Sequence, residues 1–284
     1  MSLCRLANAV CCAPPISWLL PAPRLWNRRE PLRYLQRRLQ EGTRFLEGLC
    51  SEDELASWRV LDVGCGMGDR AVAVALAGSP AAVGVDTDPE KIIWGRTLEL
   101  SCGTGRASFV LGTGARLPFP DGSFDLVLLL DVIEHLDQPL AVLADVRRVL
   151  VPGGKALVTF PPYLGPWGAH LWKHVRIPWA HLICPETQLL NLWREIHGRE
   201  VARGRIRTSA ARARCIMEAD TIPELWSLNE MTIGRFLDLL TAASLEPILV
   251  RLHTPGGLAA PLTRLRKIRE YLVTRLSAVV ERPC

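Results

Sequence analysis

The sequence predicts a doubly wound α/β fold whose mostly parallel, seven-stranded sheet carries an inserted segment after the fifth strand. From Trp58 onward, short apolar runs alternate with amphipathic stretches, which is the pattern of parallel strands joined by helices. The runs are nearly continuously apolar, as expected for strands that are covered on both faces. A glycine-rich turn follows the first run directly. These observations together indicate a Rossmann-like architecture.

Each strand is expected where an apolar run of strand length is bounded by turn residues. The expected strands are residues 59–63, 82–85, 107–111, 124–130, 155–160, 247–252 and 275–280. Helices are expected where apolar residues recur at helical spacing, near 24–49, 69–77, 89–100, 138–150, 185–197, 233–240 and 264–271. Three of these helices have a terminal signal, with Asp88 and Asp137 as N-caps and Gly198 just past the end of the fifth helix.

The chain is expected to divide into four segments. Residues 1–56 form an N-terminal helical cap, and residues 57–161 form the cofactor-binding α/β core. Residues 162–230 form an inserted substrate lid, because the strand–helix alternation stops there and tryptophan and histidine become frequent. Residues 231–284 complete the core.

Composition indicates a cytoplasmic protein. No apolar run reaches the roughly 18 residues that span a bilayer, and Pro14 and Pro15 interrupt the apolar stretch that a secretory signal would need. The nine cysteines are odd in number, scattered and without a Cys-x-x-Cys pair, which favours reduced thiols over disulfides or a zinc ribbon. The sequence does not indicate an oligomeric state.

The net charge of +5 is modest, but arginines crowd two segments, near residues 24–44 and 199–214. Such runs are either solvated helix faces or surfaces for phosphates and anionic membranes. Neither run has the interleaved aromatic residues of a nucleic-acid groove, so a nucleic-acid partner is disfavoured. Peripheral membrane contact stays open.

The turn after the first strand is the first candidate site. Gly64, Gly66 and Gly68 let the chain bend tightly and let a ligand approach the backbone. The spacing G-C-G-M-G departs from the G-x-G-x-x-G of dinucleotide enzymes. Asp62, just before the turn, would repel a pyrophosphate and would attract the ammonium of an amino-acid moiety. Asp86, at the end of the second strand, either accepts hydrogen bonds from ribose hydroxyls or is an ordinary turn residue.

The motifs of residues 58–161 together resemble one family. Val60–Asp69 and Val83–Asp86 look like the first two motifs of class I S-adenosylmethionine-dependent methyltransferases. Leu117–Val127, Glu134–Leu136 and Leu150–Lys155 resemble the ubiquinone/menaquinone-type small-molecule branch of that family.

The resemblance implies S-adenosylmethionine as cofactor and assigns residues to its parts. By position, the residues expected to bind the methionine end are Asp62, Gly64, Cys65, Gly66 and Gly68. Asp86 and Thr87 are expected to bind the ribose, and Thr113 and Gly114 are expected to face the adenine. Many relatives have Gly-Asp-Ala-Glu at residues 112–115, where this chain has Gly-Thr-Gly-Ala, so Thr113 replaces a carboxylate.

The residues after the fourth strand face the sulfonium in this architecture. Asp131 is the candidate closest to the methyl group. His135 is either a general base, for which its ordinary pKa suits it, or a helix-start histidine bonded to backbone. Glu134 is a candidate helix-start carboxylate.

In the insertion, the candidate substrate contacts are Tyr163, Trp167, His170, Trp172 and Trp179. They either line an apolar substrate pocket or form the lid's own core. His170, His174, His181 and Cys184 have some zinc-like spacing, but Lys173 and Pro178 intervene and the cysteine is single. No metal is therefore expected.

Three functions compete. The first is methylation of a small, largely apolar metabolite such as a quinone, polyketide or lipid precursor. The second is an RNA methyltransferase that uses the arginine runs. The third is a non-catalytic cofactor-binding protein, which the intact glycine turn and Asp86 disfavour.

Overall fold

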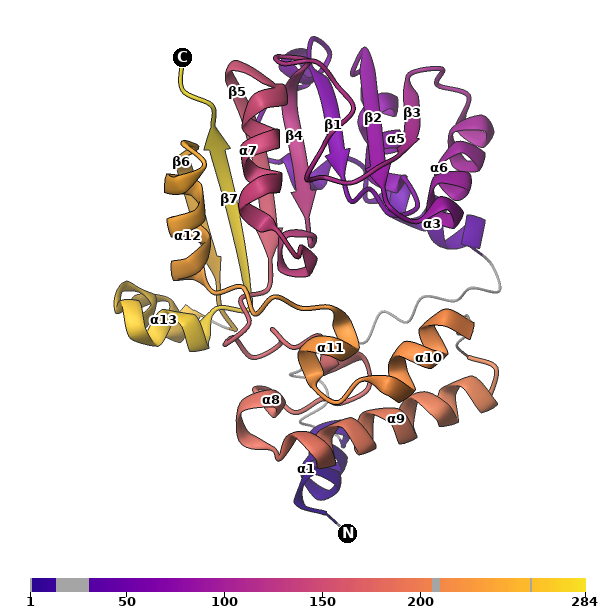
Figure 1. Cartoon of the computed structure of the whole chain (residues 1–284), viewed down its shortest axis with the longest axis vertical. Helices are drawn as coiled ribbons and strands as arrows, with labels where there is room; N and C mark the ends of the chain where they lie inside the picture. The colour runs from indigo at the N-terminus through magenta and orange to yellow at the C-terminus, as the bar shows by residue number, and fades with distance from the viewer. Residues whose placement is uncertain (1, 14–30, 206–209, 256) are drawn as a thin grey trace. The chain divides into compact units, whose positions relative to one another are not determined.

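The computed structural model describes residues 2–13, 31–205, 210–255 and 257–284 (Figure 1). It contains two compact units. The sheet unit comprises Leu32–Phe160, Gly234–Arg251 and Leu276–Cys284. The helical unit comprises the described residues of Met1–Pro31, Pro161–Ile233 and Leu252–Arg275. Residues 1–56 are therefore shared between the two units, with helix α1 in the helical unit and α3 in the sheet unit.

The sheet has seven strands in the order β3-β2-β1-β4-β5-β7-β6. Strands β1 to β5 pair in parallel, whereas β7 is antiparallel to β5, with Phe160 opposite Leu276. Their bounds are Arg59–Val63, Ala81–Asp86, Ala107–Leu111, Phe124–Leu130, Leu150–Phe160, Glu246–His253 and Arg275–Glu281. The predicted doubly wound, mostly parallel fold is confirmed.

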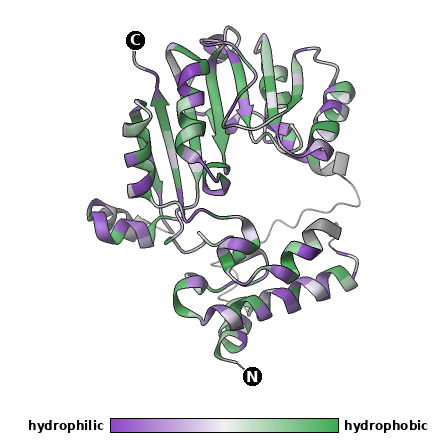
Figure 2. Ribbon diagram, viewed as in Figure 1, coloured by the Kyte–Doolittle hydropathy of each residue, from purple (hydrophilic) through white to green (hydrophobic). Residues whose placement is uncertain are grey.

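Burial explains why these segments are strands. Residues 126–130 of β4 are all buried, and Figure 2 shows hydrophobic colour along most of the central strands. Because side chains leave a strand on both faces, a strand buried on both faces needs a continuous apolar run.

Among the described residues, eight helical segments belong to the sheet unit. They are α3 (Pro31–Gln40), η1 (Arg44–Leu46), α4 (Glu52–Leu55), α5 (Asp69–Leu76), α6 (Pro89–Cys102), the short turn η2 (Ile133–His135), α7 (Pro139–Val149) and α12 (Ile233–Ala242). The Asp88 side chain accepts a hydrogen bond from the Glu90 amide and caps α6, as predicted.

Phe109 of β3 fills a socket made of glycines. A Cβ placed on Gly68, Gly84 or Gly95 would lie 2.4 to 2.8 Å from the Phe109 ring, closer than any packed contact allows. The residue before α5, strand β2 and the middle of α6 therefore all pack against one buried ring.

The helical unit has its own apolar core around Trp193, which is 1% exposed. The core joins α1 (Leu3–Cys12), α9 (Glu186–Ala202), α10 (Ala210–Glu218) and α11 (Ile222–Trp226). The unit also contains η3 (Leu171–Lys173), α8 (Ala180–Ile183), η4 (Gly257–Arg264) and α13 (Arg266–Leu272). None of the helices that the structure describes is long and apolar enough to span a membrane.

Several predicted boundaries were wrong. The helix expected over 24–49 is α3, which ends at Gln40, followed by the 3-10 turn η1; residues 24–30 lie outside the described part. The cap of α7 is Gln138 rather than Asp137, with Pro139 in the first turn. Helix α9 continues through Gly198 to Ala202. Strand β5 begins at Leu150, with a register shift against β4.

Candidate cofactor site

The glycine-rich turn joins β1 to α5 and is anchored on β2. The amides of Gly64 and Cys65 both donate to the Val85 carbonyl, at 2.7 and 3.0 Å. Gly64, Gly66 and Gly68 all have positive φ, of 69°, 56° and 81°, a conformation that glycine adopts without steric cost. The turn therefore lies at the carboxyl edge of the parallel strands, where ligands of this architecture bind.

The three glycines of the turn differ in what surrounds them. A Cβ on Gly64 would lie 2.6 Å from Val132, and one on Gly68 would enter the Phe109 ring. A Cβ on Gly66 would meet no atom within 4 Å. Packing thus explains two of the glycines, and Gly66 is the one whose bare backbone is open to a ligand.

Asp62 is buried in front of this turn. Its carboxylate is 2% exposed, and Oδ2 has no hydrogen-bond partner among the described residues. Burial raises its pKa to about 7, against the opposing charge of Arg70, while Asp69 and Asp86 raise it further. A buried carboxylate oxygen without a partner is costly, and an ammonium would satisfy it. The residues present therefore fit the amino-acid end of S-adenosylmethionine.

Asp86 is both a turn residue and an acceptor placed at the site. Its Oδ2 accepts from the Gly66 amide at 2.9 Å, and its Oδ1 accepts from the Asp88 amide at 3.0 Å. Lys91, one turn into α6, lies 3.3 Å from Oδ1. A carboxylate has about four acceptor positions, so capacity remains for ribose hydroxyls, particularly where the half-exposed Lys91 moves aside.

The other predicted cofactor residues differ in their surroundings. The Cys65 side chain is buried in the core, 6% exposed and close to Gly84, and its Sγ donates to the Gly66 carbonyl at 3.7 Å. Burial also raises the pKa of its thiol. Thr87 and Thr113 are exposed, and the Thr113 hydroxyl accepts from the Ala115 amide at 3.3 Å. Gly114 packs closely, because a Cβ there would lie 3.0 Å from Val63.

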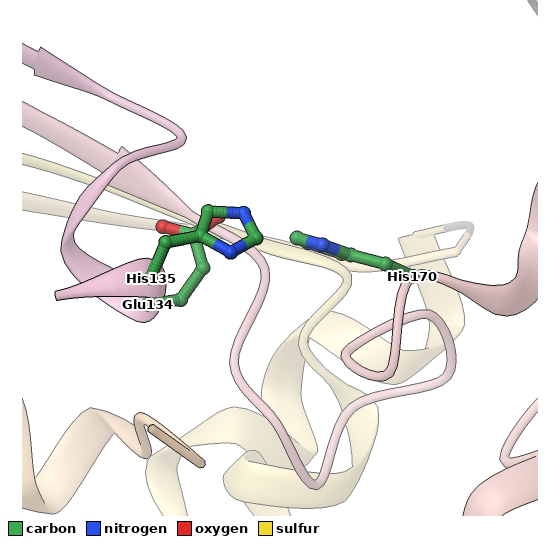
Figure 3. A group of neighbouring side chains, drawn as sticks. All are labelled: Glu134, His135 and His170. Carbon is green, nitrogen blue, oxygen red and sulfur yellow. The ribbon is translucent and has the colours of Figure 1, made fainter. Parts of the chain in front are cut away.

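The chain leaves β4 through a residue of unusual backbone conformation. Asp131 has φ of 60°, and its amide donates to the Thr159 carbonyl at 2.8 Å. A left-handed residue that is not glycine stores strain, and such strain concentrates at functional positions. Figure 3 shows Glu134 and His135 projecting from the short turn η2 that follows, with Glu134 buried and His135 partly exposed.

The predicted substrate residues all belong to the helical unit. Tyr163 packs against its core, and its ring meets the His181 ring edge-on at 5.0 Å. The Trp179 indole N–H donates to the Tyr271 carbonyl at 2.7 Å. Trp167, Trp172 and His170 are each partly exposed, with the His170 ring, also drawn in Figure 3, 6.4 Å from the Trp226 ring.

The histidines weighed as zinc ligands have other neighbours. His174 Nε2 lies 3.1 Å from His197 Nδ1, and Trp193 stacks on the His197 ring at 4.8 Å. His181 Nε2 lies 2.6 Å from the Tyr163 carbonyl, and burial lowers the pKa of its imidazole. Two of the four residues with zinc-like spacing, His174 and His181, thus have different neighbours.

Sequence reasoning missed two charged residues at the cofactor site, Arg70 and Lys91. Lys91 has a readable signal, since it lies five residues after Asp86 and in the first turn of a predicted helix. Arg70 has a weaker one: it stands two residues past the last glycine of the turn, where a helix directs it back toward the strand ends.

Comparison with known proteins matches residues 61–158 to a family of methyltransferase domains. The matched segment runs from β1 to β5 and contains the glycine turn, Asp62, Asp86 and Asp131. Residues 61–158 form a class I S-adenosylmethionine-dependent methyltransferase domain. The cofactor of this domain family is S-adenosylmethionine, as the resemblance implied; membership of the ubiquinone/menaquinone-type branch is a finer assignment that the match does not make.

The methyltransferase domain has relatives in mycobacteria that are themselves described as uncharacterized methyltransferases. A protein from Mycobacterium marinum, described as an uncharacterized methyltransferase, is 37% identical over 118 residues, which are 42% of this chain and 45% of the relative. The chain therefore matches less than half of that relative's length.

Solved structures share the fold of the methyltransferase domain at low identity. An S-adenosylmethionine-dependent methyltransferase from Methanosarcina mazei is 18% identical with a TM-score of 0.51, over 84% of this chain and 97% of that one. The [4+2]-cyclase SpnF is 16% identical with a TM-score of 0.52, over 93% and 84%. The second likeness shows that the shared fold does not by itself fix the reaction.

Proposed function

We propose that the whole protein transfers the methyl group of S-adenosylmethionine to a small, largely apolar acceptor of the quinone, polyketide or lipid-precursor class. The observation that carries the proposal is the buried Asp62 Oδ2, which lacks a partner beside a turn where Gly66 is open. Because native proteins are only marginally stable, such a costly group is expected mainly where a ligand satisfies it.

When bound, the cofactor supplies an electrophilic methyl group, whose bond to sulfur breaks as the bond to the acceptor forms. Asp62 would hold the ammonium of the methionine moiety, and Asp86 the ribose hydroxyls. Thr113 and the Gly114 amide would face the adenine. These residues contribute by fixing orientation, which is the main source of acceleration when little proton transfer is needed.

On the acceptor side, Asp131 would position the nucleophilic atom near the methyl group. For a phenol or enol acceptor, His135 would take the proton that the hydroxyl loses. Strain at Asp131 supports this assignment, because the fold maintains an unfavourable backbone there.

The inserted residues 162–230 would act as the substrate lid. The chain enters them directly after Phe160, the last residue of β5, so they begin at the carboxyl edge of the parallel strands. Their buried residues form an apolar core that is completed by Cys4 of α1. Tyr163, Trp167, His170, Trp172 and Trp179 would supply the acceptor contacts and exclude water.

Ion pairing favours a small acceptor over RNA. Arg199 pairs with Glu195, and both Arg203 and Arg205 pair with Glu200 within or just beyond α9. Arg38 likewise pairs with Asp69 and Glu41. Phosphate binding requires arginines that are free to neutralise the backbone, and these already have carboxylate partners.

The test is to incubate the protein with methyl-labelled S-adenosylmethionine and either total RNA or a solvent extract of metabolites. We expect label in an organic-solvent-extractable small molecule, and none with an Asp86→Ala variant. Label in RNA would establish the second candidate. Cofactor binding without transfer to either fraction would favour a non-catalytic role.

A further inference from the structure

A pocket in the sheet unit lies beside the glycine turn. It is lined by residues of α3, of η1 and its preceding turn, and of the first turns of α5, among them Arg38, Arg44, Phe45, Asp69, Arg70 and Ala73. Asp69 is already paired with Arg38 at 3.0 Å, and Glu41, also in the lining, lies 3.3 Å from Arg38. The two remaining arginines, Arg44 and Arg70, give the pocket its positive charge.

Arg70 is held in place but has unused donors. Its guanidinium lies over the Phe45 ring, 6.0 Å from the ring centre. Nη1 lies 3.5 Å from the carbonyl of Leu130, the last residue of β4. That is a long contact and its one hydrogen bond within the described part of the chain, whereas a guanidinium has five N–H donors.

Arg70 and Asp62 form a pair of opposite charges at the same end of the sheet. The positive charge of Arg70 opposes the rise in the pKa of the Asp62 carboxyl. No hydrogen bond joins the two side chains among the described residues, and Asp62 Oδ2 has no partner there. An amino-acid group has its ammonium and its carboxylate on the same α-carbon, so a ligand of that kind could satisfy both side chains at once.

We infer that Arg70 binds the carboxylate of the methionine moiety of S-adenosylmethionine, while Asp62 binds its ammonium. The inference rests on the assignment of the cofactor to this site and is independent of the acceptor. Phe45 is a positioning residue, because its ring holds the guanidinium toward the strand ends. Arg44 supports the positive charge of the pocket from the exposed side.

Binding measurements with two ligands separate this role from a structural one. Calorimetry compares S-adenosylmethionine with its decarboxylated form, which keeps the sulfonium and ammonium and lacks only the carboxylate. Arg70→Met should weaken binding of S-adenosylmethionine by about 10- to 100-fold, the range for a charge-assisted hydrogen bond. It should leave the affinity for the decarboxylated form within about threefold of the unmodified protein.

Arg96→Met is the matched control. Arg96 also reaches a strand carbonyl, that of Phe109 at 3.0 Å, but from α6 and without a part in the pocket. This variant should not discriminate between the two ligands. Arg70→Lys should bind S-adenosylmethionine more tightly than Arg70→Met and less tightly than the unmodified protein. The lysine ammonium keeps the positive charge but lacks the planar set of N–H donors of the guanidinium.

Equal weakening of both ligands by Arg70→Met would overturn the inference and assign Arg70 a structural role. Equal affinity of the unmodified protein for the two ligands would overturn it as well. Failure of the unmodified protein to bind S-adenosylmethionine at all would instead refute the cofactor assignment. A phosphate titration that displaces neither ligand excludes a free anion as the occupant of the pocket, whereas displacement of both ligands alike would make phosphate the occupant.

Discussion

At the scale of single residues, the proposed cofactor site depends most on Asp62. Its position before the glycine turn could be read from the sequence, and so could its attraction for an ammonium. Its burial could not, because the atoms that cover it come from elements distant in the chain. The combination of burial and a missing partner makes the charge of Asp62 depend on pH near neutrality.

We expect the affinity for S-adenosylmethionine to rise with pH up to about 7 and then to level off. Below that value Asp62 is protonated in the cofactor-free protein, since its pKa is raised to about 7, and binding the ammonium requires loss of the proton. The affinity should fall by up to about tenfold for each pH unit below this range. Calorimetry between pH 5.5 and 8 measures the effect, and Asp62→Asn should bind weakly with no such slope.

Because no protein atom lies near the position of a Cβ on Gly66, alanine at this position tests whether the cofactor lies over the turn. Gly66→Ala adds a methyl group that meets no protein atom, so its folding cost is the strain of a positive φ, about 1 to 2 kcal/mol. Cofactor affinity should fall by at least about tenfold, because the methyl group occupies the approach of the ligand. Gly103→Ala, at φ 66° and equally open, carries the same strain far from the turn. If both variants bind the cofactor normally, the ligand does not lie over Gly66.

At the scale of elements, strands were easier to predict than helix ends. The strands 59–63, 107–111 and 124–130 were predicted to the residue. In 124–130, burial on both faces leaves a nearly uninterrupted apolar run, whereas 107–111 is an edge strand in which only Phe109 is buried. Helix ends depend on contacts that local patterns do not contain. Gly198 was expected to follow the end of α9, yet the helix continues to Ala202. A Glu195–Arg199 ion pair spans the position, and a Glu200–Arg203 pair follows it. A glycine costs a helix only about 1 kcal/mol, which such neighbours offset.

The two helical glycines Gly95 and Gly198 should respond in opposite ways to alanine. Gly198→Ala faces open space and should stabilise the protein by about 1 kcal/mol through helix propensity. Gly95→Ala places a methyl group 2.7 Å from the Phe109 ring and should destabilise by about 1 to 3 kcal/mol. Urea unfolding measures both changes. Phe109→Leu should recover part of the loss in the Gly95→Ala background, and equal effects of the two alanines would contradict the socket.

At the scale of the whole molecule, the two units have separate apolar cores, and the chain passes between the units several times. The sequence predicted an insertion and its starting point after the fifth strand. It did not predict that α1 and residues 252–275 would join the insertion, because that assembly is built from separated segments. For the same reason Asp62, Gly66 and Asp86 became candidates from two local sequence motifs, whereas Arg70 became one only through its neighbours Phe45 and Leu130.

Because each unit has its own apolar core, we expect the cofactor to stabilise the sheet unit more than the helical unit. S-adenosylmethionine at about 100 times its dissociation constant should add about 2.7 kcal/mol to the sheet unit, which carries the site. Of the seven tryptophans in the described part of the chain, five belong to the helical unit, so tryptophan fluorescence reports mainly on that unit. They are Trp167, Trp172, Trp179, Trp193 and Trp226. Its thermal transition should move less on cofactor addition than the transition seen by circular dichroism. Coincident shifts would mean that the molecule unfolds as one cooperative body.

The Phe109 socket also limits the order in which this sequence can evolve. Gly68, Gly84 and Gly95 lie on three different elements, yet each is closed to any larger residue by the same ring. A lineage that starts from this sequence must therefore shrink residue 109 before any of the three glycines can change. Once one glycine has gained a side chain, the return to phenylalanine is blocked in its turn. The first substitution at this ring would thus commit all descendants to a different packing of the cofactor turn.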